Sequence, residues 1–247
     1  MKYFAKIKYL GTHFHGFQVQ PGKRTVQGVL CESLEQALGF PCRVTGCSRT
    51  DAGVHANEFC ITVECEGATV PPEKLPVAVS RFLPEDLSLF YAKECDLSFH
   101  PRYDCISKEY IYKIKNCRVY DPFEYGRVWF LPKPINDCDV QRMNECCILL
   151  VGKHDFAAFM AEGSDVTDSV RTVNYLNVEK TFDSIVIRIC ADGFLYNMVR
   201  IIVGTLIDVA YGRKNANDVL QALSLKSRSL CGMTAPAEGL YLNKVNY

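Results

Sequence analysis

Hydrophobic and polar residues alternate at the start of the chain. Every second position from Tyr3 to Tyr9 is apolar or aromatic, and most of the positions between them are lysines. This pattern predicts a strand over residues 2–10 with one solvated face. A polar and aromatic loop follows, and apolar positions then recur at helical spacing between Thr25 and Gly39. A threonine before a helix and a glycine after it are typical caps.

The next hundred residues continue with extended segments. Residues 42–46 and the alternating positions 59, 61 and 63 predict two strands, and residues 89–92 predict another. Between them, the proline-rich stretch 71–84 leaves room for a short helix at most. The order of elements up to residue 105 is therefore β-α-β-β-α-β.

The remainder of the chain gives a second set of strands and helices. Four segments predict strands, namely residues 106–114, 172–178, 184–190 and 240–245. Three others predict helices, namely residues 139–150, 195–211 and 218–225, and we expect Gly152 to stop the first of them. The element order therefore repeats roughly near residue 105. We predict an α+β fold of two similar halves, residues 1–105 and 106–247, each an antiparallel or mixed sheet with helices packed on one face.

Two residues in the second half have notable positions. Tyr110 shares one face of the strand 106–114 with Tyr112 and Ile114, and aromatic side chains in such a place are usually part of a core. Arg200 lies beside the centre of the apolar stripe on the helix 195–211. We therefore expect the Arg200 side chain to lie next to the buried face of that helix.

Composition describes an ordinary soluble globular protein. Hydrophobic residues make up 48% of the chain, and the 28 Lys and Arg residues balance 28 Asp and Glu residues. A formal charge of zero argues against binding nucleic acid by net charge alone. However, the first 24 residues carry five cations and no acidic residue, among them Lys6, Lys8 and Arg24. This cluster is either a local basic patch or a set of solvated strand faces.

The cysteines indicate the compartment. There are thirteen, an odd number, and they show no spacing typical of metal ligands, so we expect reduced thiols, no metal and a cytoplasmic protein. His13 and His15 likewise lack further residues that would complete a metal site. No run approaches about 20 apolar residues, and no signal-peptide pattern is present, so we expect no membrane insertion.

The stretch Cys47–Ala56, which reads Cys-Ser-Arg-Thr-Asp-Ala-Gly-Val-His-Ala, is the strongest candidate site. Asp51 and Gly53 favour a turn, and the flanking segments are extended, so we expect a loop that joins two strands. Loops held by strands often carry catalytic groups. Without further information, an Asx-turn with a solvated arginine is the far more frequent explanation of a lone aspartate in a loop.

Several motifs together resemble the TruA family of tRNA pseudouridine synthases, in the same order and over nearly the whole chain. The motifs are Gly11, Gly16–Gln20, Thr25–Gln27, Arg49–Ala56, Phe99–Arg102, Lys108–Tyr112, Met198–Gly204 and Ala235–Leu240. The run Arg-Thr-Asp-Ala-Gly-Val-His-Ala is the most specific of them.

The resemblance implies isomerisation of uridine to pseudouridine at positions 38, 39 and 40, in the anticodon stem-loop of tRNA. It also implies a homodimer without cofactor or metal, in which two halves flank the active-site cleft. The long apolar stripe on the helix 195–211 suggests the same assembly. Asp51 takes the place of the catalytic aspartate, Tyr110 that of the tyrosine against the target base, and Arg200 that of the arginine paired with the aspartate. Arg49 matches the arginine that displaces the target nucleotide.

Some positions depart from the family pattern. Phe17 stands where tryptophan is frequent and Val19 where arginine is frequent, and Cys47 and Ser48 replace residues that are commonly small. Members of the family are also often more basic than this chain. Because phosphate contacts supply much of the affinity for RNA, these changes bear on tRNA binding, for which we expect Lys6, Lys8 and Arg24 to contribute.

The chemistry accounts for the expected residues. Isomerisation breaks a glycosidic bond and rejoins the base through carbon, which requires an ionised carboxylate, and Arg200 would keep Asp51 ionised. The target base must leave its stack, and Tyr110 would recover part of that free energy.

Three alternatives are open. Asp51–Gly53 superficially resembles the motif of dimeric aspartic proteases, although those carboxylates share a proton whereas this pattern asks for an ionised one. The chain could be a non-catalytic tRNA-binding relative, or it could modify another RNA or position.

Overall fold

The computed structural model describes residues 2–163 and 166–247. The chain forms two compact units, Met1–Ile106 with Tyr241–Tyr247, and Ser107–Leu240. The last strand, β10 (Leu240–Asn246), thus groups with the first unit, whereas the sequence placed it in the second half. Its pairing explains the difference, since Tyr241 and Leu242 lie in parallel register with His55 and Ala56 of β3 (His55–Cys65).

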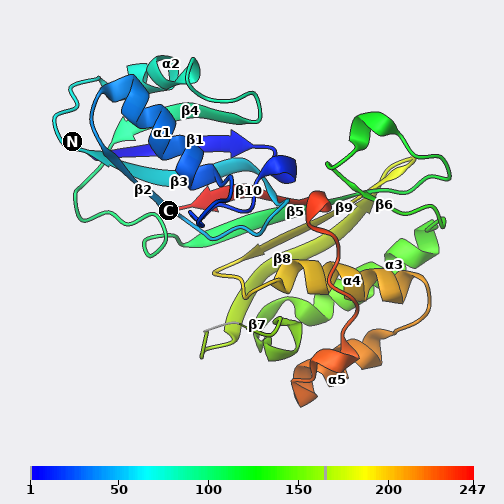
Figure 1. Ribbon diagram of the computed structural model, residues 1–247. Helices are drawn as coiled ribbons and strands as arrows, with labels where there is room; N and C mark the ends of the chain where they lie inside the picture. The colour runs from blue at the N-terminus through cyan, green and yellow to red at the C-terminus, as the bar shows by residue number, and fades with distance from the viewer. Residues whose placement is uncertain (1, 164–165) are drawn as a thin grey trace. The chain divides into compact units, whose positions relative to one another are not determined.

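Unit 1 has the predicted β-α-β-β-α-β order. Its remaining elements are β1 (Lys2–Tyr9), α1 (Val26–Leu38), β2 (Cys42–Gly46), α2 (Leu75–Ser80) and β4 (Leu87–Glu94), with 3-10 turns at Gly11–His13 and Pro72–Lys74. The strands follow the order β4-β1-β3-β10, and β2 also pairs with β3. In Figure 1, α1 and α2 lie on the same side of this sheet. Thr25 and Gly39 cap α1 as predicted, the latter with a φ of 76°.

In its described residues, unit 2 combines five strands with three helices. Its strands are β5 (Ser107–Lys115), β6 (Trp129–Phe130), β7 (Gly152–Asp155), β8 (Val170–Lys180) and β9 (Ser184–Ala191), in the order β5-β9-β8-β7 with β6 beside β5. Its helices are α3 (Asp137–Leu150), α4 (Met198–Ala210) and α5 (Ala216–Leu225), and 3-10 turns cover Pro122–Glu124, Ala157–Phe159, Arg228–Leu230 and Ala237–Gly239. The sequence predicted all of these strands and helices except β6 and β7. The α+β class is confirmed.

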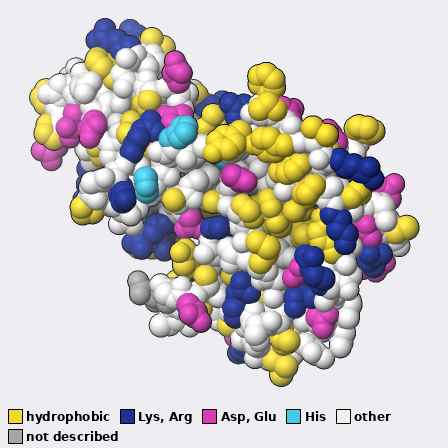
Figure 2. All heavy atoms as spheres, turned by 45° about the vertical axis from the view of Figure 1, so that its right-hand side comes forward, with side chains coloured by type: hydrophobic (Ala, Val, Ile, Leu, Met, Phe, Trp, Pro, Cys, Tyr) yellow, Lys and Arg dark blue, Asp and Glu magenta, His cyan; other side chains and the backbone are white. Residues whose placement is uncertain are grey.

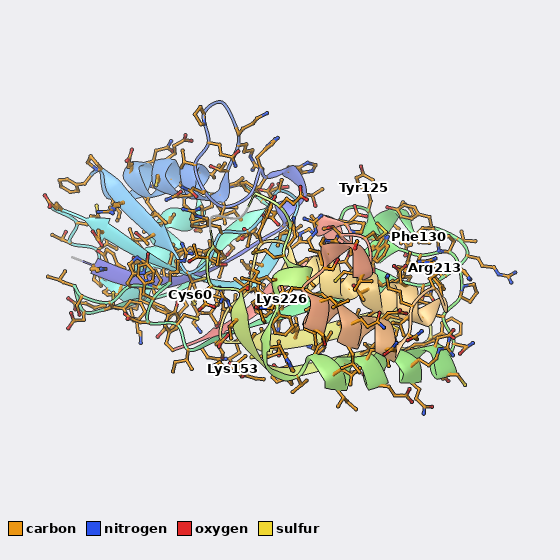
Figure 3. All side chains as sticks on the ribbon, turned by 90° about the horizontal axis from the view of Figure 1, so that it is seen from below. Cys60, Tyr125, Phe130, Lys153, Arg213 and Lys226 are labelled. Atoms are coloured by element: carbon orange, nitrogen blue, oxygen red, sulfur yellow. The ribbon has the colours of Figure 1, made fainter. Side chains whose placement is uncertain are left out.

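Two helix ends in unit 2 have clear physical causes. α3 begins earlier than expected because Asn136 and Asp139 form a capping box, in which each side chain accepts a hydrogen bond from the other residue's backbone. α5 ends at Leu225 because Lys226, labelled in Figure 3, adopts a left-handed conformation with a φ of 52°; the Lys226 Nζ lies 2.6 Å from an oxygen of Asp155.

The apolar stripe of α4 is part of the core of unit 2. Met198, Ile202, Leu206 and Val209 are all at most 2% exposed, and the helix packs against α3. The stripe is therefore not a free surface for a partner, and it gives no support to a homodimer. Figure 2 shows cationic and acidic side chains intermixed on the visible face, as the neutral composition leads one to expect. No helix of the described residues is long and apolar enough to span a bilayer.

Candidate active site

Asp51 opens a tight turn. The N–H of Val54 donates to the Asp51 carbonyl oxygen at 3.2 Å, and Gly53 between them has a φ of 80°. A type II turn needs such a positive φ at its third residue, which explains a glycine there. The side chain of Asp51 is half-buried. Because β3 begins at His55, the loop is two residues shorter at this end than the sequence suggested.

A second loop packs directly against this turn. A Cβ atom at Gly11 would lie 2.0 Å from the carbonyl oxygen of Val54, and one at Gly16 would lie 2.5 Å from that of Thr50. The N–H of Phe17 donates to the same Thr50 oxygen at 3.1 Å. The glycines that carry part of the family resemblance therefore permit two stretches of backbone to approach more closely than any other residue would allow.

The residues around Asp51 have buried hydrogen bonds. The hydroxyls of Thr50 and Tyr9 lie 2.8 Å apart, and Nδ1 of the fully buried His55 accepts the Gly11 N–H at 2.9 Å. The His55 ring also stacks on Tyr241, with the ring centroids 4.4 Å apart. These contacts join the turn to β1, to the Gly11 loop and to β10, so the position of Asp51 is fixed from several directions.

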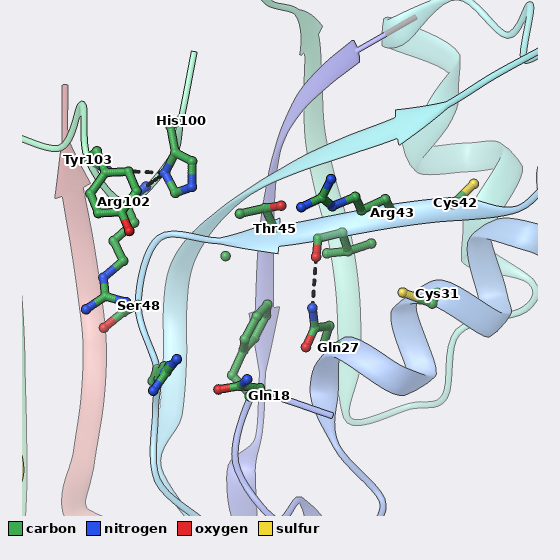
Figure 4. A pocket seen from close by; sticks show the side chains of 14 residues that line it. Gln18, Gln27, Cys31, Cys42, Arg43, Thr45, Ser48, His100, Arg102 and Tyr103 are labelled. Atoms are coloured by element: carbon green, nitrogen blue, oxygen red, sulfur yellow. Dashed lines mark hydrogen bonds between the residues drawn. The ribbon is translucent and has the colours of Figure 1, made fainter. Parts of the chain in front are cut away.

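Arg49, by contrast, faces an open pocket. Ser48 and Arg49 line a cavity of about 480 Å³ in unit 1, together with residues of α1, β2 and the turn 100–103 (Figure 4). The side chain of Arg49 is exposed. The loop thus presents a half-buried carboxylate and, two residues earlier, a solvent-accessible guanidinium.

In unit 2, two hydrogen bonds hold the side chain of Arg200. Its Nε donates to the carbonyl oxygen of Ala235 at 2.7 Å, and its Nη1 donates to Oδ1 of Asn197 at 2.8 Å. Asn197 precedes α4 in a left-handed conformation with a φ of 58°. Asparagine tolerates this region better than most residues, and such strained positions cluster at functional sites.

Tyr110 and Tyr112 lie on one face of β5, as predicted. Tyr110 is 6% exposed and meets Phe194 edge to face, with the ring centroids 5.0 Å apart. The Tyr112 hydroxyl donates to the carbonyl oxygen of Pro236 at 2.7 Å. Burial raises the pKa of Tyr112 far above its ordinary value, and the nearby positive charge of Arg200 only partly opposes this.

The predicted site residues therefore fall in two groups. Asp51 and Arg49 belong to unit 1, and Tyr110 and Arg200 belong to unit 2. Within unit 2, the segment Ala235–Gly239 contacts both Arg200 and the strand of Tyr110. Its carbonyl oxygens accept hydrogen bonds from the Arg200 and Tyr112 side chains, and Gly239 packs on the Tyr112 ring. The pairing of Asp51 with Arg200 stays a prediction.

The three expected phosphate-binding cations have different surroundings. Lys6 lies 3.0 Å from Glu58, close enough for an ion pair although that carboxylate oxygen has no hydrogen bond. Arg24 makes two hydrogen bonds of 2.8 Å to Asp86. Lys8 is exposed, and its Nζ lies 4.5 Å from the centre of the Phe90 ring. Two of the three thus already have a carboxylate partner.

The sequence missed several of these residues. Asn197 gives no signal of its own, because its importance comes from a left-handed backbone and a side-chain contact with Arg200. The motifs Phe99–Arg102 and Ala235–Leu240 did signal their importance, but not what they contact. Among the described residues, no group of three or more His, Cys, Asp or Glu side chains could hold a metal ion.

The sequence is similar to those of known proteins. The sequence model of a family described as tRNA pseudouridine synthase matches residues 5–104 and 146–247. The chain belongs to the tRNA pseudouridine synthase family. The matched regions of this pseudouridine synthase include Asp51, Arg49 and Arg200, whereas Tyr110 lies in the interval between them.

Relatives extend the match over the full length. A protein named tRNA pseudouridine synthase A 2, from Clostridium tetani, is 40% identical over 98% of this chain and 97% of its own. A tRNA pseudouridine synthase A from Thermoanaerobacter sp. is 42% identical over the same shares of the two chains. Among solved structures, a Cbf5-Nop10-Gar1 complex matches 98% of this chain and 49% of that chain, with a TM-score of 0.39 and 12% identity.

Proposed function

We propose that this protein isomerises uridine to pseudouridine at positions 38, 39 and 40 in the anticodon stem-loop of tRNA, with Asp51 as the nucleophile. The observation that carries the proposal is the turn at Asp51. It sets one half-buried carboxylate beside an exposed arginine, within the most specific motif of a chain that is 40% identical to a named tRNA pseudouridine synthase.

The reaction determines what the site must supply. The bond between the sugar carbon C1′ and N1 of uracil breaks, the base turns, and C1′ bonds to C5. The proton of C5 leaves to solvent and N1 gains a proton, so no electrons are exchanged with a cofactor. A carboxylate can attack the sugar or the base as a covalent catalyst, and it must be ionised to do so.

Arg200 is suited to keep Asp51 ionised. A guanidinium cannot lose its proton at physiological pH, and a cation near a carboxylate lowers the pKa of that carboxylate. The bonds from Arg200 to Ala235 and Asn197 fix two of its nitrogens and thereby the direction of the remaining donors. We propose that Asp51 is their target.

Tyr110 and Arg49 would handle the target base. Extracting a stacked base into a pocket costs a few kcal/mol, roughly, and an aromatic ring recovers about 1–3 kcal/mol by stacking. The Tyr110 ring is held edge to face by Phe194 and is nearly buried, which suits a fixed stacking surface. Arg49 is exposed and can enter the stack in place of the base.

Affinity for tRNA would come from phosphate contacts. Lys8 fits this role because it is exposed and has no carboxylate partner among the described residues. Lys6 and Arg24 would have to exchange Glu58 and Asp86 for a phosphate, which reduces their net contribution. We propose all three as contacts, with Lys8 as the strongest.

We also propose a cytoplasmic homodimer. The resemblance implies the dimer, and the exposed aromatic residues of unit 2 offer a surface for it, since Phe123 is 86% and Tyr125 71% exposed. The cytoplasmic location rests on the thirteen cysteines, which suit a reducing compartment. Sedimentation of the purified protein checks the assembly, and a monomer mass at every concentration would contradict it.

Release of tritium tests the enzymatic proposal directly. Because C5 of uracil loses its hydrogen in the reaction, tRNA labelled with tritium at C5 of uridine should release label to water when the folded protein is added. Transcripts in which uridine is kept only at positions 38, 39 or 40 test the sites. No release from any tRNA would overturn the enzymatic proposal, and release only from other transcripts would overturn the positions.

A further inference from the structure

The pocket beside Arg49 is strongly basic. Its lining includes Arg43 of β2, Arg49 of the Asp51 loop and Arg102 of the turn after Phe99, and it includes no acidic residue (Figure 4). All three guanidinium groups are on exposed residues, and none has a carboxylate partner among residues 2–163 and 166–247. They differ in this from Lys6 and Arg24, which hold Glu58 and Asp86.

The turn that carries Arg102 is rigidly built. Nδ1 of His100 accepts the backbone N–H of Arg102 at 3.1 Å and that of Tyr103 at 3.3 Å, and an oxygen of Asp104 accepts the His100 N–H at 2.7 Å. The N–H of Asp104 donates back to the carbonyl oxygen of His100 at 3.0 Å. The His100 ring thus holds the backbone of Arg102 and Tyr103, and the Asp104 side chain closes the turn.

The same turn is anchored in the core of unit 1. Phe99 packs against the rings of Phe4 and Tyr247, at centroid distances of 5.6 Å and 5.2 Å. The Tyr247 hydroxyl donates to the carbonyl oxygen of Pro101 at 2.8 Å. The Phe99–Arg102 motif therefore fixes the turn to the core of unit 1. The turn in this way holds Arg102 and Tyr103 in the lining of the pocket.

Tyr103 gives the pocket an aromatic surface. It is 75% exposed, and its ring lies on that of His100 with the centroids 4.2 Å apart and the planes inclined by 32°. The Arg102 guanidinium lies 6.0 Å from the centre of the same ring. A large, exposed aromatic ring fixed from one side and flanked by cations is the arrangement that binds an unstacked nucleobase together with its phosphate.

We propose that this pocket holds one nucleotide of the RNA substrate next to the one on which Asp51 acts, with its phosphate at Arg43 and Arg102 and its base on Tyr103, while Arg49 in the same lining takes the place of the target base in the stack. The proposal rests on the proposed function. A volume of about 480 Å³ suits a ligand of this size. Arg49 and Asp51 are separated by a single residue, so their Cα atoms are at most about 7 Å apart.

The arginines, the tyrosine ring and Gln27 favour binding without a base preference, and the side chains of Gln18, Thr45 and Ser48 complete the polar lining. The amide of Gln27 is already committed, because its Nε2 donates to the carbonyl oxygen of Val44 at 2.9 Å (Figure 4) and its Oε1 accepts the Val19 N–H at 3.0 Å. Stacking on tyrosine accepts any base, and arginine contacts to phosphate carry no sequence information. The pocket therefore suits an enzyme whose substrates differ in sequence around the target.

Measurements of tRNA binding at several salt concentrations test the phosphate-binding arginines and the base-binding tyrosine of the pocket separately. Arg43→Ala and Arg102→Ala should each flatten the plot of log affinity against log salt by about 0.7 to 0.9, the loss of one phosphate contact. Tyr103→Ala should weaken binding by about 5- to 150-fold at constant salt slope, and Tyr103→Phe should restore it. Arg81→Ala is the matched control, because Arg81 is an exposed arginine of unit 1 outside the pocket. Circular dichroism verifies that each variant is folded.

The outcomes separate this proposal from the enzymatic one. Unchanged affinity and salt slope in all three pocket variants would overturn the nucleotide pocket even if tritium release remained normal. A loss in Arg81→Ala as large as in Arg102→Ala would also overturn it, because binding would then follow total charge. Losses confined to the pocket variants, in a protein that releases no tritium, would support the pocket and reject the enzymatic proposal.

Discussion

Arg200 and Ala235 are joined by two reciprocal hydrogen bonds. The Arg200 side chain donates from Nε to the Ala235 carbonyl oxygen at 2.7 Å, and the Ala235 N–H donates to the Arg200 carbonyl oxygen at 3.1 Å. The arginine thus connects the start of α4 to the segment before β10. Its guanidinium is positioned by the fold of unit 2 itself, before any substrate binds.

This geometry predicts that charge alone is insufficient at position 200. Arg200→Lys keeps the positive charge but loses the planar fork that reaches Ala235 and Asn197 together. Hydrogen bonds to charged groups contribute about 1.5–3 kcal/mol each, so we expect turnover to fall by about 10-fold or more. Tritium release at saturating tRNA measures this. Arg213→Lys, an exchange at an exposed arginine paired with Asp208, is the control. Turnover near the original rate would show that only the charge matters.

Asp51→Asn separates catalysis from binding. The substitution keeps the size of the side chain and removes the negative charge and the nucleophile. We expect tritium release to fall below detection. Affinity for tRNA should survive or rise, because the loss of one negative charge reduces the repulsion between the protein and the RNA. Asp137→Asn, at an exposed carboxylate of α3, should leave both unchanged. Turnover retained by Asp51→Asn would refute its role as nucleophile, and loss of binding in a folded variant would assign Asp51 to recognition.

Gly11→Ala should disturb the Asp51 turn from outside. The new Cβ would lie 2.0 Å from the backbone oxygen of Val54, so one of the two loops must move. We expect a loss of about 1–3 kcal/mol in the free energy of unfolding together with lower turnover. Urea unfolding and tritium release measure the two effects. Gly22→Asn is the control, because Gly22 has a φ of 68°, which asparagine tolerates, and no neighbour within 4 Å. Equal stability of both variants would contradict the close approach.

The sequence predicted elements whose pattern is local. The strand β1 and the helix α1 were evident from alternation and from the caps Thr25 and Gly39. The strand β7 was missed because its four residues, Gly-Lys-His-Asp, contain no apolar alternation and become a strand only by pairing with β8. β10 was recognised as a strand, but its grouping depends on pairing with β3, a contact far along the chain.

The candidate site likewise has features that the sequence predicts and features that only the folded structure shows. The Asp51 turn could be predicted, because Asp and Gly at that spacing favour a turn and the motif is specific. The support of Arg200 could not, since Asn197 and Ala235 act through one side-chain oxygen and one backbone oxygen. The pocket formed by Arg43, Arg49 and Arg102 is likewise invisible in the sequence, because the net charge is zero and the three residues meet only through folding.

Buried thiols predict loss of stability at high pH. Burial raises the pKa of Cys147 from 9.0 to about 12, and burial with the negative charge of Glu58 raises that of Cys60, labelled in Figure 3, to about 12. In the unfolded chain both thiols ionise near pH 9, whereas the folded protein keeps them protonated. The unfolded state therefore binds fewer protons between pH 9 and 12, and the stabilisation present below pH 9 is lost as the pH rises through this window.

We expect the free energy of unfolding to decrease from pH 9 upward, with each such thiol contributing up to about 1.4 kcal/mol per pH unit. Urea unfolding at intervals between pH 8 and about pH 11 measures the slope. Cys147→Ala should make the slope shallower, whatever its effect on stability at neutral pH, because one titrating group is gone. Cys138→Ala, at an exposed cysteine, should leave the slope unchanged. Equal slopes in both variants would show that Cys147 ionises alike in the folded and unfolded states, and its burial would then have no part in the alkaline instability.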